Sequence, residues 1–178
     1  MQSMDKKTEK ILVKKCLRND RLSQKQLFDQ YKDAMYTLCY RITADEEDAK
    51  DALQEGFIAV FNSLSSFSFK STLGAWIKTI IVRTAIRKTK KLYFESIENV
   101  EDESYTFDES LNGEMLHKAI MMLDPGFRSV FILYEVEGYS HKEIAEIADI
   151  SVGTSKSQLH YAKKKLKSII VNQFEYER

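Results

Sequence analysis

The sequence predicts an all-α protein with two helical domains joined by a flexible acidic linker, the second domain being a helix-turn-helix. Apolar residues recur at helical spacing almost everywhere, and no stretch alternates strictly between apolar and polar residues for more than a few positions. The 178 residues include only one proline and six glycines, so few positions interrupt a helix. Charge is also distributed unevenly along the chain, although the formal net charge is zero.

The charge distribution predicts the domain boundaries. Residues 1–91 contain 18 basic and 11 acidic residues, residues 92–116 contain eight acidic residues and no basic one, and residues 117–178 contain nine basic and eight acidic residues. The acidic stretch has little helical periodicity, which is typical of a linker. We therefore expect an N-terminal domain over 1–91, an acidic linker over 92–110 and a C-terminal domain over 111–178.

In the N-terminal domain, the apolar spacing predicts helices near 6–17, 23–42, 45–64 and 72–89. Thr43 is expected to cap the third of these helices, and Ser71 or Thr72 the fourth. The acidic run "DEED" falls in the first turn of the third helix, where the helix dipole favours negative charge.

The C-terminal domain carries stronger signals for helix ends. Asp124 followed by Pro125 is typical of a helix start, and Gly138 is expected to end that helix. Ser140 and Glu143 have the spacing of a capping box. Ser151 is expected to cap the last helix after a short turn, so the sequence predicts a helix-turn-helix.

The last helix contains a basic segment, "ISVGTSKSQLHYAKKKL", from Ile150 to Leu166. Five lysines and no acid lie between Ile150 and Phe174, which indicates an anionic partner. In a helix-turn-helix the second helix enters the major groove of DNA, its first turns facing bases and its lysines facing phosphates. The alternative is a lysine face that only contacts solvent. The candidate DNA-binding residues are Thr154, Lys156, Ser157, Gln158, His160, Tyr161, Lys163 and Lys164.

Several other classes of protein are disfavoured. No apolar run is long enough for a membrane span, and the N-terminus lacks the apolar core of a secretory signal. Cys16 and Cys39 fit no zinc spacing and are expected to be reduced, buried thiols. No phosphate loop or hydrolase motif is present, and the three histidines lie about 20 or more residues apart. We expect no catalytic residue, metal or cofactor.

Two separate segments resemble the extracytoplasmic-function sigma factors, subunits of bacterial RNA polymerase. "GYSHKEIAEIADISVGTSKSQLHYAKKKL" is similar to the domain that recognises the −35 promoter element, and "LDPGFRSVFILYEVEG" to the helices before it. Upstream, "DEEDAKDALQEGFIAVFNSLSSF" resembles the segment that binds the polymerase clamp helices. "FKSTLGAWIKTIIVRTAIRKTKK" is similar to the segment that melts and holds the −10 element. The resemblance covers about 22–170.

The resemblance implies two further sets of binding residues. The residues implied for core polymerase are Asp48, Asp51, Gln54 and Glu55. Those implied for the −10 element are Phe67, Phe69, Lys70, Ser71, Trp76, Lys78, Arg83 and Arg87, with Lys88, Lys90 and Lys91 extending the basic track. Holding a melted strand requires stacking surfaces and cations, which these residue types supply. Trp76 also fits the apolar rhythm of Ala75-Trp76-Ile77, which favours a core residue of the N-terminal domain over a DNA contact.

Some positions depart from the family pattern. Ser155 stands where valine is frequent, which predicts looser packing of the recognition helix. Gln158 and Tyr161 stand where arginines are frequent, so base recognition is expected to rely less on arginine–guanine pairs.

The resemblance also implies the partners: core RNA polymerase, promoter DNA and an anti-sigma factor. We expect a cytoplasmic protein without direct membrane insertion that is a monomer when free. The alternative function is a helix-turn-helix regulator that binds duplex DNA without polymerase. Such a regulator would need a dimerisation or effector domain within residues 1–90.

Overall fold

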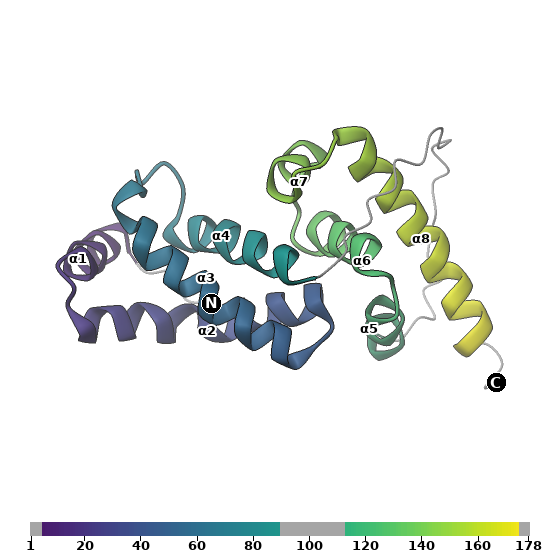
Figure 1. Cartoon of the computed structure of the whole chain (residues 1–178), viewed down its shortest axis with the longest axis horizontal. Coiled ribbons are helices and arrows are strands. Elements are labelled where there is room, and N and C mark those ends of the chain that lie inside the picture. The colour runs from purple at the N-terminus through teal and green to yellow at the C-terminus, as the bar shows by residue number, and fades with distance from the viewer. Residues whose placement is uncertain (1–4, 90–112, 175–178) are drawn as a thin grey trace. The chain divides into compact units, whose positions relative to one another are not determined.

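The computed structural model describes residues 5–89 and 113–174, and these residues are helical without any strand. Figure 1 shows the helices in chain order. Their bounds are α1 Lys6–Leu17, α2 Arg21–Thr43, α3 Glu46–Ser63, η1 Leu64–Ser66, α4 Leu73–Lys88, α5 Gly113–Met121, α6 Pro125–Phe131, η2 Ile132–Val136, α7 His141–Ala148 and α8 Val152–Phe174.

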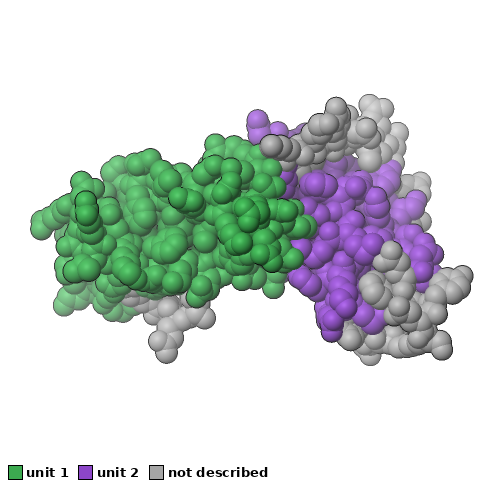
Figure 2. All heavy atoms as spheres, turned by 60° about the horizontal axis from the view of Figure 1, so that its bottom comes forward, with its two compact units in different colours: residues 1–88 green, residues 89–178 purple. Residues whose placement is uncertain are grey.

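The chain divides into two compact units, Met1–Lys88 and Thr89–Arg178 (Figure 2). The all-α fold class is confirmed by these elements. The predicted linker, residues 92–110, lies outside the described residues, as do Lys90 and Lys91. The predicted domain boundaries at 91 and 111 also lie there and stay predictions.

Unit 1 is built on three helices, α2, α3 and α4, each of which packs against the other two. Helix α1 packs against α2 and against η1, the short 3-10 turn that follows α3. Helices α3 and α4 come close at Gly56, where a Cβ atom would lie 2.5 Å from Cδ1 of Ile81. The core of unit 1 includes Leu27, Tyr31, Met35, Leu38, Ile42, Ala49, Phe57, Val60, Leu73, Ile77 and Ile81.

One predicted helix cap in unit 1 is wrong. Thr43 is the last residue of α2, and the cap of α3 is Asp45, whose carboxylate accepts a hydrogen bond from the Asp48 amide at 2.9 Å. The chain reverses at Ala44, which adopts a left-handed conformation with φ 55°. The Thr43 hydroxyl hydrogen-bonds the backbone of Asp45, so it reaches the capping residue itself and not an amide of the first turn of α3. At α4, Thr72 is the capping residue, because its hydroxyl accepts from the Ala75 amide at 3.2 Å.

Unit 2 is organised around α8, against which α5, α6 and α7 all pack. Helix α6 continues directly into η2, a π-helical turn, and the chain then turns at Gly138 with φ 75°. Arg128 is a buried residue of α6, and its guanidinium donates to the carbonyl of Leu123. Burial lowers the pKa of Arg128, and that carbonyl satisfies part of the buried charge.

No helix among residues 5–89 and 113–174 is both long and apolar enough to span a membrane.

Candidate nucleic-acid interface

Helices α7 and α8 form the predicted helix-turn-helix (Figure 1). Ser140 and Glu143 make the complete capping box at the start of α7. The turn passes through Asp149, which is left-handed with φ 56°. Ser151 then caps α8, accepting from the Thr154 amide at 2.8 Å. The two helix starts are thus fixed by short-range hydrogen bonds.

One face of α8 is packed inside unit 2. Its buried residues recur every three or four positions, as expected for a helix face: Ser155, Leu159, Ala162, Leu166 and Ile170. The opposite face, around Lys156, Lys164 and Lys167, is exposed.

The predicted loose packing at Ser155 is wrong. Ser155 is 0% exposed, and its hydroxyl lies 2.9 Å from Nδ1 of His141 on α7. The imidazole of His141 in turn stacks on Tyr134, with ring centroids 4.4 Å apart. A polar contact thus joins α7 and α8 at Ser155.

Ser157 and Gln158, which are predicted to contact bases, are both buried in this structure, and their contact with DNA stays a prediction. Gln158 is 2% exposed because it borders the packed face of α8, and its Oε1 has no hydrogen-bond partner among the residues that the structure describes. Ser157 is 5% exposed, and its hydroxyl donates to the carbonyl of Thr154 within the same helix. The Thr154 hydroxyl is itself engaged with Ser151 in the helix cap.

The lysines of α8 fall into two groups. Lys163 pairs with Glu135 of η2 at 2.7 Å, and Lys165 pairs with Asp124 at 2.6 Å. The structure shows no ion pair or hydrogen bond from the other three to any residue that it describes. We call these three the lysine stripe: Lys156, Lys164 and Lys167.

The lysine stripe has the spacing of a single helix face: eight residues separate Lys156 from Lys164, and three separate Lys164 from Lys167. His160 belongs to the same row, four residues from Lys156 and from Lys164. Tyr161 lies beside this row and stacks on Phe127 with ring centroids 6.3 Å apart, while His160 meets Tyr161 edge-on. The three lysines of this row are exposed and form a cationic surface opposite the packed face.

The predicted −10 residues of unit 1 gather around an aromatic cluster. The ring of Phe67 lies 4.6 Å from that of Phe69 and 5.3 Å from that of Trp76, measured between centroids. Phe67 is buried, Trp76 is half-buried and Phe69 is 41% exposed. The half-burial of Trp76 and its contact with Phe67 agree with a packed residue of unit 1, and its contact with the −10 element stays a prediction.

Two of the predicted cations share a helix face with this cluster. Arg83 lies seven residues after Trp76, and Arg87 lies four residues after Arg83; both arginines are exposed. Lys70 and Ser71 are exposed in the loop before α4. Lys78 is half-buried, and its spacing from Arg83 places it on another side of α4.

The predicted polymerase-binding residues lie together on α3. Asp51, Gln54 and Glu55 are exposed, and Asp48 is half-exposed one turn before them. Lys88, at the end of α4, pairs with Glu55 at 2.6 Å and with Asp51 at 3.5 Å. The hydrogen bond to Glu55 is the main cause that raises the pKa of Lys88.

Lys88 was expected to extend the basic track toward DNA; in this structure it pairs with acids of α3, and the DNA contact stays a prediction. Its partners lie more than 30 residues earlier, so no local signal links them. Sequence reasoning also missed an apolar groove beside the acids, which is lined by Phe28, Lys50, Leu53, Gln54, Phe57, Ile58 and Phe61.

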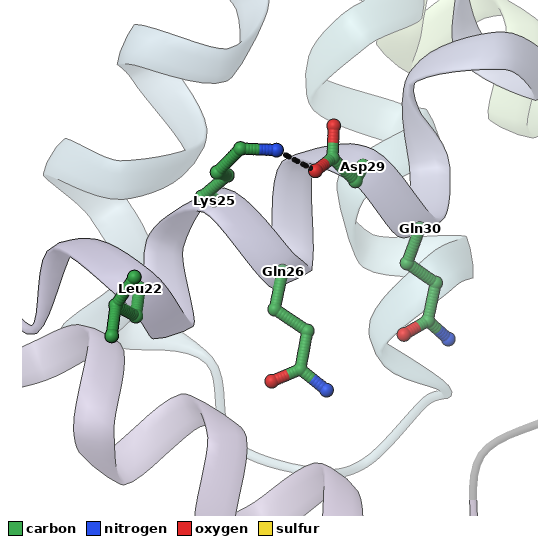
Figure 3. Close-up of a pocket in the computed structure, with 5 residues that line it drawn as sticks. All are labelled: Leu22, Lys25, Gln26, Asp29 and Gln30. Atoms are coloured by element: carbon green, nitrogen blue, oxygen red, sulfur yellow. Dashed lines mark hydrogen bonds and ion pairs between the residues drawn. The ribbon is translucent and has the colours of Figure 1, made fainter.

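Helix α2 carries a second groove, at which sequence reasoning predicted no site. Leu22, Lys25, Gln26, Asp29 and Gln30 line it, and Lys25 pairs with Asp29 (Figure 3). Leu22 is 80% exposed there. In the part of the chain that the structure describes, no group of three or more His, Cys, Asp or Glu side chains is arranged to hold a metal ion.

Comparison with known families matches each unit separately. Residues 27–93 match "Sigma-70 region 2", and residues 113–166 match "Sigma-70, region 4". The first match covers the aromatic cluster and the α3 acids, and the second covers the helix-turn-helix. The two regions in this order define a transcription initiation factor of the sigma type.

Similar curated proteins agree with this class. YlaC of Bacillus subtilis, an RNA polymerase sigma factor, is 31% identical over 88% of this chain and 96% of its own length. SigW of Bacillus subtilis, an ECF RNA polymerase sigma factor, is 29% identical over 87% of this chain and 92% of its own length. SigE of Mycolicibacterium smegmatis, also an ECF sigma factor, is 28% identical over 82% of this chain. That match covers 60% of the length of SigE.

This chain belongs to the sigma-70 family of RNA polymerase sigma factors, in the extracytoplasmic-function (ECF) group. Among solved structures, the sigma factor RpoE of Bartonella quintana, crystallised with the anti-sigma factor NepR, has the same fold. The TM-score is 0.57 at 24% identity, over 84% of this chain and 97% of that one. A helix-turn-helix regulator that works without polymerase is not favoured, because the N-terminal unit matches region 2.

Proposed function

We propose that this chain is a dissociable promoter-specificity subunit: it joins core RNA polymerase, recognises −10 and −35 promoter elements, and opens the DNA. The observation that carries this proposal is the presence of two separate candidate DNA surfaces, the aromatic cluster of unit 1 and the lysine stripe of unit 2. In this proposal the polymerase performs the phosphodiester chemistry and the chain itself is not an enzyme. It works in the cytoplasm, where polymerase and promoter are.

For the −35 element, the exposed row of α8 is proposed to enter the major groove. Lys156 and His160 lie on its first turns and are proposed to face base edges together with Tyr161. Lys164 and Lys167 lie further along and are proposed to face phosphates. Thr154, at the helix cap, and Lys163, which pairs with Glu135, are proposed as secondary contacts. Ser157 and Gln158 are left out because their side chains are buried.

For the −10 element, the exposed ring of Phe69 and the edge of Trp76 are proposed to stack on unpaired bases. Phe67 supports both rings from below. Lys70 and Ser71 in the loop, and Arg83 and Arg87 on α4, are proposed to hold the phosphates of the melted strand. Lys78 is the least well placed of this set, because it is half-buried on another side of α4.

For core polymerase, the α3 face with Asp48, Asp51, Gln54 and Glu55 is proposed to dock on a basic surface. Asp51 and Glu55 are already paired with Lys88, so docking is proposed to exchange that pairing for cations of the polymerase. An anti-sigma factor is a further proposed partner, and the free chain is proposed to be a monomer.

The test is reconstituted transcription. The purified chain is mixed with bacterial core polymerase and a library of random promoter sequences, and run-off transcripts are sequenced. We expect transcripts that depend on the chain and share two sequence elements. Core polymerase alone is the control. If the chain neither co-elutes with core polymerase nor directs initiation, the proposal is wrong.

A further inference from the structure

The loop before α4 holds an unfavourable backbone conformation. Phe69 has φ 58°, in the left-handed region that side chains with a Cβ rarely adopt. Its ring is nevertheless 41% exposed, so burial in the core does not explain the conformation. Surrounding contacts must hold this residue in place.

Helix α1 supplies one such contact. The ammonium group of Lys10 lies 5.6 Å from the centre of the Phe69 ring, within the range of a cation–π interaction. Phe67 contacts the same ring, with centroids 4.6 Å apart. The side chain of Phe69 thus contacts both a cation from α1 and an aromatic ring from its own loop.

The neighbouring residue of α1 contacts the other end of the loop. Oε2 of Glu9 accepts a hydrogen bond from the Leu73 amide at 3.4 Å, across 64 positions of sequence. Leu73 begins α4, so its amide is one of the first-turn donors that lack a partner within the helix. A carboxylate at this end of α4 is also favoured by the helix dipole. Helix α1 packs against η1 as well, which precedes the loop.

We infer that α1 is part of the promoter-opening apparatus, with Lys10 as a positioning residue that holds the Phe69 ring ready to stack on an unpaired base. The inference rests on the proposed function. Glu9 and Lys10 fix the loop at two points, which reduces the conformational freedom that would be lost when a base is captured. Nothing in the sequence of α1 alone marks these two residues, because their partners lie about 60 positions away.

The test compares two variants of the full chain in holoenzyme. Lys10→Met removes the charge and keeps an unbranched, flexible side chain. Lys14→Met makes the same change in net charge one turn later on α1, at an exposed lysine, and is the control. Open-complex formation is measured on a promoter selected from the library. A duplex template is compared with one carrying a mismatched, pre-melted −10 region.

We expect Lys10→Met to reduce open-complex formation on duplex DNA about two- to fivefold relative to Lys14→Met, because an exposed cation–π contact contributes an effect of that size. The pre-melted template should recover most of the loss, and Lys10→Arg should behave like the parent chain. In a Phe69→Ala background, Lys10→Met should have no further effect, because both changes remove the same interaction.

Equal behaviour of Lys10→Met and Lys14→Met on both templates would overturn the inference. So would an undiminished effect of Lys10→Met in the Phe69→Ala background, which would mean that Lys10 acts directly on DNA. If the parent chain does not initiate from either template, the proposed function fails and the inference with it. Thermal unfolding of each variant, followed by circular dichroism, checks that the fold is intact.

Discussion

The imidazole Nδ1 of His141 lies 2.9 Å from the hydroxyl oxygen of Ser155, which joins the two helices of the helix-turn-helix. Ser155 is fully buried on α8, and His141 occupies the first position of α7. This hydrogen bond lies near the start of α8, where it links the recognition helix to α7.

Ser155→Ala is expected to destabilise unit 2. The substitution leaves Nδ1 of His141 without this partner, and the loss of one buried hydrogen bond costs about 1 kcal/mol. Native-state hydrogen exchange of the α8 amides measures the effect within unit 2. Ser168→Ala, at an exposed position of the same helix, is the control and should change little. Unchanged protection of α8 in Ser155→Ala would show that the bond does not hold the helices.

Loss of one lysine from the stripe is expected to weaken −35 binding for all sequences. Lys164→Ala should lower the slope of log affinity against log salt by about 1, because one phosphate contact is lost. Lys165→Ala should lower it less, because Lys165 is already paired with Asp124. Holoenzyme binding to −35 duplexes at several salt concentrations measures both. If Lys165→Ala has the larger effect, a different face of α8 meets the DNA.

Gln158→Met is expected to leave the base preference unchanged. The buried Oε1 of Gln158 has no hydrogen-bond partner within residues 5–89 and 113–174, so an apolar side chain of similar shape should keep or slightly raise the free energy of unfolding. Promoter selection with the variant holoenzyme and hydrogen exchange of α8 measure the two quantities. His160→Ala is the comparison, since it removes a proposed contact and should alter the selected −35 sequences. A change in selected sequences with Gln158→Met would mean that this residue reaches the DNA.

Asp51→Arg is expected to weaken binding to core polymerase about tenfold, or about 1.4 kcal/mol. The new cation would stand beside Lys88 and oppose a basic partner surface, while the exposed site should leave the fold intact. Affinity is measured by competition for fluorescently labelled core polymerase. Glu46→Arg makes the same charge change on another side of α3 and is the control. Equal affinities for the two variants would contradict docking through the Asp51 face.

Cys39 is expected to resist alkylation in the native chain. Burial raises the pKa of its thiol to about 12, so at pH 8 only about one molecule in 10⁴ carries the reactive thiolate. Burial also raises the pKa of Cys16. Peptide mass spectrometry after iodoacetamide treatment, with and without urea, measures the modification. Labelling of native Cys39 at the rate of the urea-unfolded chain would contradict the burial of this thiol.

The sequence by itself determined the features that depend on near neighbours. Ser140 with Glu143, Ser151 and Thr72 mark helix starts, because a side-chain cap acts over two or three residues. The Asp124–Pro125 pair marks the start of α6 through the proline at its first position, since the Asp124 side chain makes no capping hydrogen bond. The two family segments and their order also followed from contiguous motifs. The exception is Thr43, where the competing cap at Asp45 was only two residues away.

Only the tertiary structure decided which polar side chains are available to partners. Lys163 and Lys165 meet acids from other elements, whereas Lys164 does not meet any in the part of the chain that the structure describes. Lys88 turns to the acids of α3 and Gln158 is buried. The physical reason is that a helix repeats every 3.6 residues, so neighbours in sequence point in different directions. What each one meets then depends on how separate helices pack, which no local pattern specifies.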